Sequence, residues 1–303
     1  MINKGPVEKT LTAQEVQQYL QRLNYSGDCS ADIQTLTNLH RAHMENVPFE
    51  NLDIVLGHEI KLLPAALFAK VVNGKRGGFC YEVNFLFASL LSALGFEVYL
   101  HAARVYGKQG YGPAFDHMLL SVRLGECLYI ADVGFGDSFI TPLCLMQGQE
   151  VGTADSPAGI ALDCLNRSEV RQGDVSYKVA MITDMTTDGL VLMQQKPSQQ
   201  WQRQYLFSLQ AFELIAFNDM CHYHQTSPKS SFTQKSVCSV ATACGRKTIS
   251  GNSFIETIDN KRYESEIADQ DNCRELLLQH FGISLPQDIS DSSWHKLLIN
   301  NRR

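Results

Sequence analysis

The hydrophobic pattern changes its period near residue 96, and this change limits the fold more than any other feature of the 303-residue chain. Before it, apolar residues recur at helical spacing, as at Val83, Phe87 and Leu90. Over Phe96–Ala102, apolar residues instead alternate with other residues, as in a half-buried strand. A helical part that is followed by strands predicts an α+β fold.

Local signals predict four helices in the first part. Thr12, Ser30 and Pro64 are placed to begin the first three helices, and Gly95 is placed to end the fourth. Later in the chain, strands are expected over roughly 161–195, and Gly251-Asn252 is typical of a tight hairpin turn. Two more helices are expected, over Leu209–Asn218 and Asp271–His280. We therefore predict three parts: a helical part (1–95), a β part (96–205) and a mixed part (206–303).

Charge and cysteine usage limit the partners and the compartment. The net charge is −6 and the chain has no long run of Lys and Arg, so we expect no nucleic acid partner. The longest apolar stretch is too short to cross a membrane, and the first residues lack the apolar core of a signal peptide. Nine cysteines without a C-x-x-C pair then predict a reduced, cytoplasmic chain without a disulfide framework.

Cys80 has the most suggestive surroundings of the nine cysteines. It lies in "RGGFCYEVN" at the predicted start of a helix, where free N–H groups and the helix dipole favour a thiolate. Gly77 and Gly78 would let a substrate approach the backbone. A free cysteine is also among the most frequently buried residues, so simple packing is the alternative.

A hairpin near residue 125 can supply the base that a reactive thiol needs. If Leu124-Gly125 form its loop, Arg123 pairs with Glu126, and His117 lies directly opposite Asp132. An imidazole beside a carboxylate is the arrangement that activates a nucleophile. A surface ion pair is the alternative, and nothing local brings His117 to Cys80.

These stretches resemble the arylamine N-acetyltransferase family. The similarity is carried by "PFEN", "RGGFCYEVN", "DH", "DVGFG" and "QTSPKSSF", which lie in this order between Pro48 and Phe232. The resemblance implies a helical N-terminal domain, a β-barrel-like middle domain and an α/β C-terminal lid. It also implies a catalytic triad of Cys80, His117 and Asp132, as in papain-like and transglutaminase-like enzymes.

The resemblance further implies acetyl transfer from acetyl-CoA, without a metal, to an aromatic amine or hydrazine. Carried over by position, the residues for the acceptor are Phe49, Val105, Asp116, Phe135 and Phe232. The positions where the family touches coenzyme A are Tyr223, Lys229 and Ser231. The residues expected to support the triad structurally are Arg76, Glu82 and Asn84.

Three other functions compete with this interpretation. A hydrolase or transglutaminase-like enzyme can use the same triad, because the triad does not determine what resolves the acyl-enzyme. A metal-binding protein could use "CHYH", with Cys221, His222 and His224, although no second ligand pair is evident. An inactive binding module is the third, and nothing in the sequence favours it.

Overall fold

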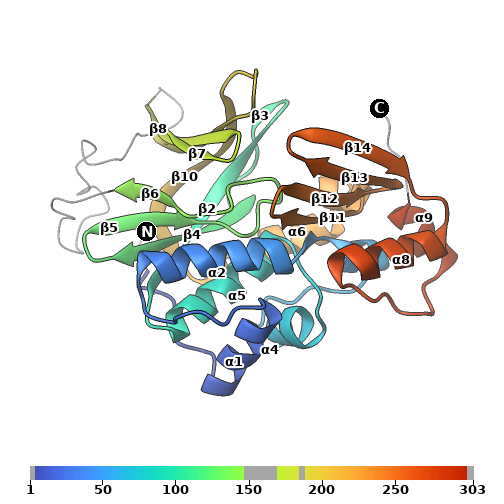
Figure 1. The fold of residues 1–303 in the computed structure, drawn as a ribbon, viewed down its shortest axis with the longest axis horizontal. Coiled ribbons are helices and arrows are strands. Elements are labelled where there is room, and N and C mark those ends of the chain that lie inside the picture. Colours follow the sequence, from blue (N-terminus) through green and yellow to red (C-terminus); the bar gives the residue numbers. More distant parts are fainter. Residues whose placement is uncertain (1–3, 147–168, 184–187, 299–303) are drawn as a thin grey trace.

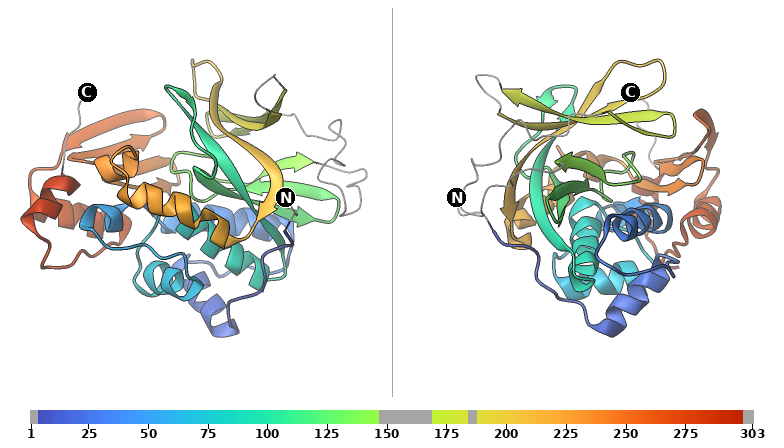
Figure 2. Two further views of the ribbon diagram at one scale, coloured as in Figure 1. Left: turned by 180° about the vertical axis from the view of Figure 1, so that it is seen from behind. Right: turned by 60° about the vertical axis from the view of Figure 1, so that its left-hand side comes forward.

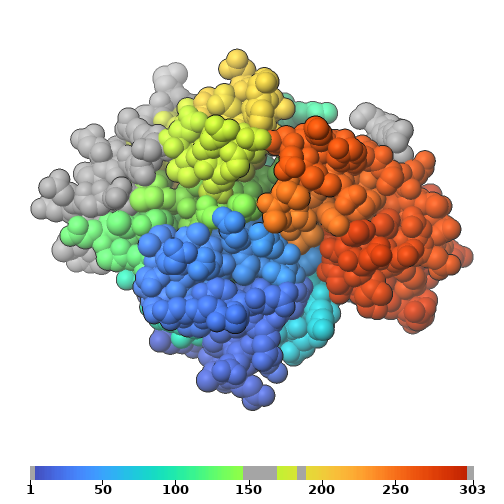
Figure 3. All heavy atoms as spheres, in the orientation of Figure 1, coloured from blue at the N-terminus to red at the C-terminus, as the bar shows by residue number. Residues whose placement is uncertain are grey.

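A computed structural model describes residues 4–146, 169–183 and 188–298 of the chain (Figure 1). It is an α+β structure, as predicted. Helices gather at one side of a large curved sheet, and a smaller sheet with its own helices forms a separate lobe. In the space-filling view, this C-terminal lobe lies beside the N-terminal helices and contacts them (Figure 3).

The described N-terminal part is helical, except for one strand of two residues. Its elements are α1 (Ala13–Arg22), α2 (Ile33–Asn46), β1 (Phe49–Glu50), α3 (Leu52–Leu56), α4 (Pro64–Phe68), the π-helical turn η1 (Ala69–Asn73) and α5 (Cys80–Ala93). The capping box of Thr12 and Glu15 is present at α1. The expected cap of α2 is wrong by two residues, because the Asp32 side chain, not Ser30, accepts the N–H of Thr35.

The large sheet holds nine strands and curls around its own core (Figure 2). Its order is β6-β5-β4-β2-β10-β9-β8-β7, with β3 paired to β2. The strands are β2 (Glu97–Gly107), β3 (Gly110–Tyr111), β4 (His117–Leu124), β5 (Cys127–Ala131), β6 (Leu143–Met146), β7 (Val170–Gln172), β8 (Val175–Thr183), β9 (Asp188–Gln195) and β10 (Gln202–Phe212). The strands expected within 161–168 lie outside the described residues.

The C-terminal lobe contains a five-stranded antiparallel sheet, in the order β1-β11-β12-β13-β14. Its elements are η3 (Leu214–Phe217), α6 (Asn218–Thr226), α7 (Ser231–Gln234), β11 (Val237–Thr242), β12 (Gly245–Ser250), β13 (Ser253–Ile258), β14 (Lys261–Glu266), α8 (Gln270–Phe281) and α9 (Asp291–Leu297). Ser250 pairs with Ser253, so the hairpin at Gly251-Asn252 is confirmed. Strand β1 joins this sheet through Phe49 and Ser239, so the N-terminal part supplies one edge of it.

One expected helix is wrong. Residues 209–212 end strand β10, the turn η3 follows, and the helix α6 begins only at Asn218. The predicted division into 1–95, 96–205 and 206–303 stays a prediction, and β10 runs across its second boundary. No helix among the described residues has both the length and the apolar character needed to cross a membrane.

Candidate active site

Cys80 is the first residue of α5, the helix that the large sheet covers. Its side chain is buried, with 3% of the residue exposed. The helix start is capped by its own chain, because Glu82 Oε2 accepts the N–H of Phe79 at 3.1 Å. The sequence therefore places Cys80 where the first N–H groups of the helix have no helical partner.

The two glycines before Cys80 serve packing instead of substrate access. A Cβ on Gly77 would lie 1.8 Å from the Pro48 carbonyl oxygen, and one on Gly78 would lie 2.7 Å from Glu82 Oε2. The space that we expected a substrate to use is thus filled by the protein itself. The glycines let the Cys80 turn pack closely against the segment that carries β1.

A buried ionic cluster lies beneath this turn. Lys70 Nζ is 2.8 Å from both Glu82 Oε1 and Asp53 Oδ2, and Arg76 Nη2 is 2.8 Å from Glu50 Oε1. Burial raises the pKa of Glu82 to about 7, although Lys70 opposes the shift. Arg76 and Glu82 therefore fasten the helix start to the helical part, which agrees with the structural role expected for them.

The predicted hairpin forms, but its register is wrong by two residues. Leu124 pairs with Cys127 around a loop of Gly125 and Glu126, and Arg123 pairs with Leu128. The guanidinium of Arg123 contacts Glu97 at 3.2 Å instead of Glu126. A shift by two residues keeps every side chain on its own face of the sheet.

His117 and Asp132 therefore still meet on one face. His117 Nε2 and Asp132 Oδ2 are 2.7 Å apart, and both side chains are buried. His117 begins strand β4, and Asp132 directly follows strand β5. The imidazole packs edge-on against Phe135, with ring centroids 5.1 Å apart.

Asp132 is held by several donors. Asn84 Nδ2 and the Gly134 N–H donate to Oδ1 at 2.9 and 3.0 Å, and the Tyr205 hydroxyl donates to Oδ2 at 3.1 Å. Burial alone would raise the pKa of Asp132, but the charge of His117 and these hydrogen bonds hold it below its ordinary value. Asp132 is therefore an anion that is already oriented toward His117.

Two supporting residues were not predicted from the sequence. The backbone N–H of Asp132 donates to His40 Nε2 at 3.1 Å, and His40 Nδ1 lies 3.0 Å from the Ile140 carbonyl oxygen. Burial lowers the pKa of His40 to about 4, so its ring is neutral at pH 7. Tyr205 comes from β10, and its contact joins residues 73 positions apart. The sequence offered one signal for His40 and Tyr205: each is a polar residue within a helix or strand that is otherwise partly apolar.

Cys80 lies against the same two strands. A Cβ on Gly134 would come within 2.7 Å of the Cys80 Cα, so the segment after Asp132 packs directly on the start of α5. Burial raises the pKa of the Cys80 thiol well above its ordinary value, although a hydrogen bond with the Met118 backbone opposes the shift. Burial thus outweighs the effect of the helix start, which was expected to favour a thiolate at Cys80.

Comparisons with known proteins agree with this geometry. A family model described as N-acetyltransferase matches residues 32–290. The chain belongs to the arylamine N-acetyltransferase family. The pineal gland isozyme NAT-3 of Gallus gallus is 31% identical over 283 residues, which cover 89% of this chain and 94% of that protein.

Solved structures of the family have the same fold. The arylamine N-acetyltransferase of Mycobacterium abscessus superposes with a TM-score of 0.80 at 26% identity, covering 94% of this chain and 95% of that one. The enzyme of Mycobacterium marinum, solved in complex with CoA, superposes with a TM-score of 0.77 at 26% identity, covering 93% and 97%. The barrel-like middle sheet predicted from the resemblance is therefore the arrangement observed here.

The aromatic residues that the family resemblance assigned to the acceptor form two groups. Phe49 on β1 lies beside Phe232 on α7, with ring centroids 6.2 Å apart. Phe135 lies beside His117 and Tyr205 instead. Val105 on β2 pairs with Tyr205 in the sheet. The first group contacts the start of α5 through Phe79, and the second contacts the triad histidine.

Residues assigned to coenzyme A lie on the C-terminal lobe of this acetyltransferase. Tyr223 is half-buried on α6, and its ring is 5.5 Å from that of His224. Lys229 and Ser231 are exposed between α6 and the start of α7. Within the described residues, Lys229 and Ser231 make no hydrogen bond or ion pair with Cys80, His117 or Asp132, so their role stays a prediction.

The three residues of the "CHYH" stretch do not converge. Cys221 is buried and receives a hydrogen bond from Gln225, His222 is exposed, and His224 faces Asp116. In the part of the chain that the structure describes, no cluster of His, Cys, Asp or Glu side chains has the three members that could hold a metal ion.

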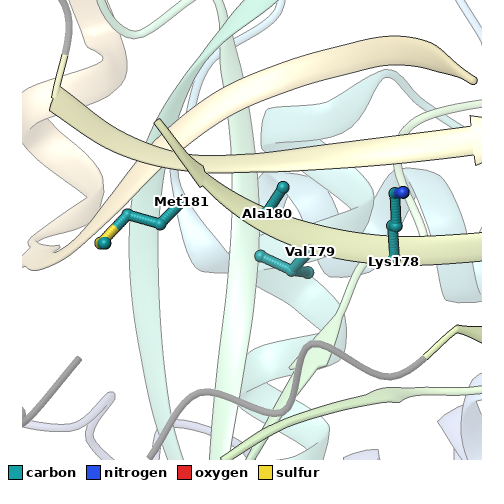
Figure 4. Close-up of a pocket in the computed structure, with 4 residues that line it drawn as sticks. All are labelled: Lys178, Val179, Ala180 and Met181. Carbon is teal, nitrogen blue, oxygen red and sulfur yellow. The ribbon is translucent and has the colours of Figure 1, made fainter. Parts of the chain in front are cut away.

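A hollow of about 290 Å³ lies away from the triad, along β8 (Figure 4). It is lined by Lys178, Val179, Ala180 and Met181, which include none of the predicted site residues. Lys178 Nζ lies 4.1 Å from the centre of the Trp201 ring.

Proposed function

We propose that the enzyme transfers an acetyl group from acetyl-CoA to an aromatic amine or hydrazine through an acetyl-Cys80 intermediate. The observation that supports this most strongly is the buried His117–Asp132 pair at 2.7 Å, on the strands against which the Cys80 turn packs. A buried His–carboxylate pair beside a cysteine is the arrangement of nucleophilic acyl transfer.

In the first half-reaction, the Cys80 sulfur attacks the thioester carbonyl. Because Nε2 of His117 is engaged by Asp132, Nδ1 is the ring nitrogen that takes the thiol proton. The carbon–sulfur bond to coenzyme A then breaks, and His117 returns the proton to the departing thiolate. One thioester replaces another, so this step needs little net driving force.

In the second half-reaction, the amine nitrogen attacks the acetyl-Cys80 carbonyl. An aromatic amine is a weak base and is uncharged at pH 7, so its lone pair is available for attack. His117 accepts the amine proton and donates it to the Cys80 sulfur as the thioester bond breaks. The product is an amide, which is more stable than the thioester, so the second step drives the reaction.

The raised pKa of Cys80 gives His117 and Asp132 a defined task. A buried thiol does not ionise alone, so the thiolate forms only as His117 becomes an imidazolium. Asp132 is already anionic and stabilises that imidazolium. The free N–H groups at the start of α5 are proposed to stabilise the oxyanion of the tetrahedral intermediate.

We propose the following contacts for the two substrates. The acceptor ring would contact Phe49, Val105, Asp116, Phe135 and Phe232. Coenzyme A would contact Tyr223, Lys229 and Ser231, since all three lie on the C-terminal lobe and Lys229 offers a cation to a phosphate.

Intact-mass analysis after mixing with acetyl-CoA alone tests the proposal. We expect the mass of one added acetyl group, and no gain for Cys80→Ala. Cys238→Ala serves as the control, because Cys238 is equally buried but lies in the C-terminal sheet. A protein that gains no acetyl group, or that releases coenzyme A continuously without an amine, would contradict the proposal and favour a hydrolase.

A further inference from the structure

A second histidine–carboxylate pair, of a buried histidine and a partly buried aspartate, lies next to the first, and the proposed mechanism does not use it. His224 Nε2 on α6 is 3.2 Å from Oδ1 of Asp116, the residue before His117. Only 7% of the His224 side chain is exposed. Its Nε2 is not aimed at the carboxylate well enough for a hydrogen bond, so the contact is electrostatic.

Both members of the pair have further partners that fix their positions. His224 Nδ1 is 3.0 Å from Ser230 Oγ, which also caps α7 by accepting the N–H of Phe232. The other carboxylate oxygen of Asp116 accepts the N–H of Val105 at 3.4 Å. The pair therefore joins the C-terminal lobe to the ends of strands β2 and β4 in the large sheet, beside His117.

The same histidine contacts the residue after Cys80. The Tyr81 ring is stacked on His224, with centroids 6.1 Å apart and 29° between the planes. The Tyr81 hydroxyl donates to the Phe115 carbonyl oxygen at 2.7 Å. His224 is thus linked to the neighbour of Cys80 by one contact and to the neighbour of His117 by another.

The segment that precedes His117 is strained. Phe115 has a φ of 63°, in the left-handed region that bulky residues avoid. Such a conformation persists only where the surroundings hold it, and it is common at functional sites. The Phe115 ring packs against Phe212 and Phe217, and the Tyr81 hydroxyl holds its carbonyl group.

The charge of Asp116 also acts on Cys80. Besides burial, the charges of Asp132, Cys221 and Asp116 raise the pKa of the Cys80 thiol. A hydrogen bond with the Met118 backbone opposes this shift. The contact of His224 with Asp116 would weaken the effect of the Asp116 charge on Cys80.

We propose that His224 is a positioning residue for acetyl transfer, which contacts Asp116 and braces Tyr81 and the Phe115–His117 segment around Cys80. The inference rests on the proposed function, because it concerns the reactivity of the same cysteine. The groups that face His224 are Asp116, Tyr81, Tyr223, Ser230 and Phe232, and Asp116 is the one carboxylate among them.

The test is the pH dependence of Cys80 alkylation by iodoacetamide, read by peptide mapping. In His224→Gln, Asp116 loses its contact with the imidazole, and the charge of Asp116 raises the pKa of the Cys80 thiol. We therefore expect the midpoint to rise by about one pH unit and the rate at pH 7 to fall about tenfold. Adding Asp116→Asn to that variant removes the charge, and the midpoint is expected to return to that of the wild type. His222→Gln on the exposed face of α6 is the matched control.

Each outcome bears on the inference. An unchanged midpoint in His224→Gln, or a double variant that is as impaired as the single one, would overturn it and leave only a packing role. If His224→Gln does not fold, His224→Lys is the second variant, because it places a cation opposite Asp116. We expect His224→Lys to keep the wild-type midpoint, and a raised midpoint would overturn the inference. Acetylation of wild-type Cys80 by acetyl-CoA is measured in parallel, so failure of the proposed function is recognised separately.

Discussion

At the residue scale, Asp132 accepts two hydrogen bonds at each carboxylate oxygen while it is fully buried. Three of the donors come from different elements: α5, β4 and β10. An anion can remain buried only when such donors replace its hydration. This arrangement sets the orientation of His117, because the imidazole is one of the donors.

We predict that Asp132→Asn folds but loses at least about 100-fold in kcat. The amide cannot balance an imidazolium and favours the wrong tautomer of His117, and a comparable change in a serine protease is more costly still. Steady-state turnover with acetyl-CoA and an aromatic amine is the measurement, with thermal unfolding as the control for folding. Turnover close to that of the wild type would show that Asp132 does not orient His117.

Buried neutral histidines make the stability of the enzyme depend on pH. Burial lowers the pKa of His101 to about 4, while its ring contacts the Gln210 carbonyl and Ser121. Below pH 6.5 the unfolded chain binds a proton that the folded chain does not, so the free energy of unfolding decreases as the pH falls toward 4.

From pH 7 to pH 5, we expect His101 to contribute about 2 kcal/mol to this decrease. Urea unfolding of wild type and His101→Gln at both pH values is the measurement. The decrease should be smaller in the variant by about that amount. An equal decrease in both proteins would mean that His101 is protonated in the folded state.

Some residues of the candidate site could be predicted from the sequence, and others could not. Motifs and a hairpin pattern predicted Cys80, His117 and Asp132 as the triad. The register error of two residues did not separate His117 from Asp132, because side chains alternate with period two. The contacts of His40 and Tyr205 with Asp132 could not be predicted. They depend on how distant elements pack, and no local pattern encodes this.

At the scale of elements, the central contact joins the start of α5 to the segment after β5. A Cβ on Gly134 would lie 2.7 Å from both the Cys80 Cα and Asn84 Nδ2. The Cα belongs to the backbone, and Asn84 Nδ2 is fixed by its hydrogen bonds to the Met118 carbonyl oxygen and Asp132 Oδ1, so neither atom can move away at little cost. The close approach of these two elements places Cys80, the proposed nucleophile, against the segment that carries Asp132.

We therefore predict that Gly134→Ala separates the two elements and lowers kcat by at least about tenfold, since misplacing a catalytic group by about 1 Å can cost 100-fold. Gly107→Ala in β2 is the matched control, because a Cβ there meets no atom closer than 4.0 Å. Acetyl transfer and thermal unfolding are measured for both variants. Equal activity of the two variants would contradict the close packing described here.

Element prediction failed where local patterns were ambiguous. The stretch 209–218 has apolar residues at helical spacing, but its first residues extend strand β10, which pairs with β2 and β9. Strand pairing over a long sequence distance outweighs such a short local preference. Strand β1 is only two residues long and was missed for the same reason.

At the scale of the whole molecule, the N-terminal and C-terminal parts are joined near the proposed acceptor site. Asn51 Nδ2 donates to the carbonyl oxygens of Phe232 and Lys235, and Asn51 Oδ1 accepts the N–H of Val237. These bonds hold the α6–α7 region, with Lys229 and Ser231, against the part that carries Cys80. The two substrates would therefore meet at the junction of the lobes.

We predict that the double variant Lys229→Ala, Ser231→Ala raises KM for acetyl-CoA several-fold and leaves KM for the amine nearly unchanged. Loss of a cation weakens binding of a phosphate-bearing donor but not of a neutral aromatic ring. Lys261→Ala on the exposed strand β14 is the control for charge alone. An unchanged KM for acetyl-CoA would remove both residues from the donor site.

The central claim is that Cys80 carries the acetyl group between the two substrates. The most direct test is to label the enzyme with isotopically marked acetyl-CoA, remove the donor by gel filtration and add 4-methoxyaniline. We expect the label on Cys80 before the amine is added and in the amide afterwards, transferred at least as fast as steady-state turnover. Label on another cysteine, or amide that forms only while acetyl-CoA is present, would contradict an acetyl-Cys80 intermediate.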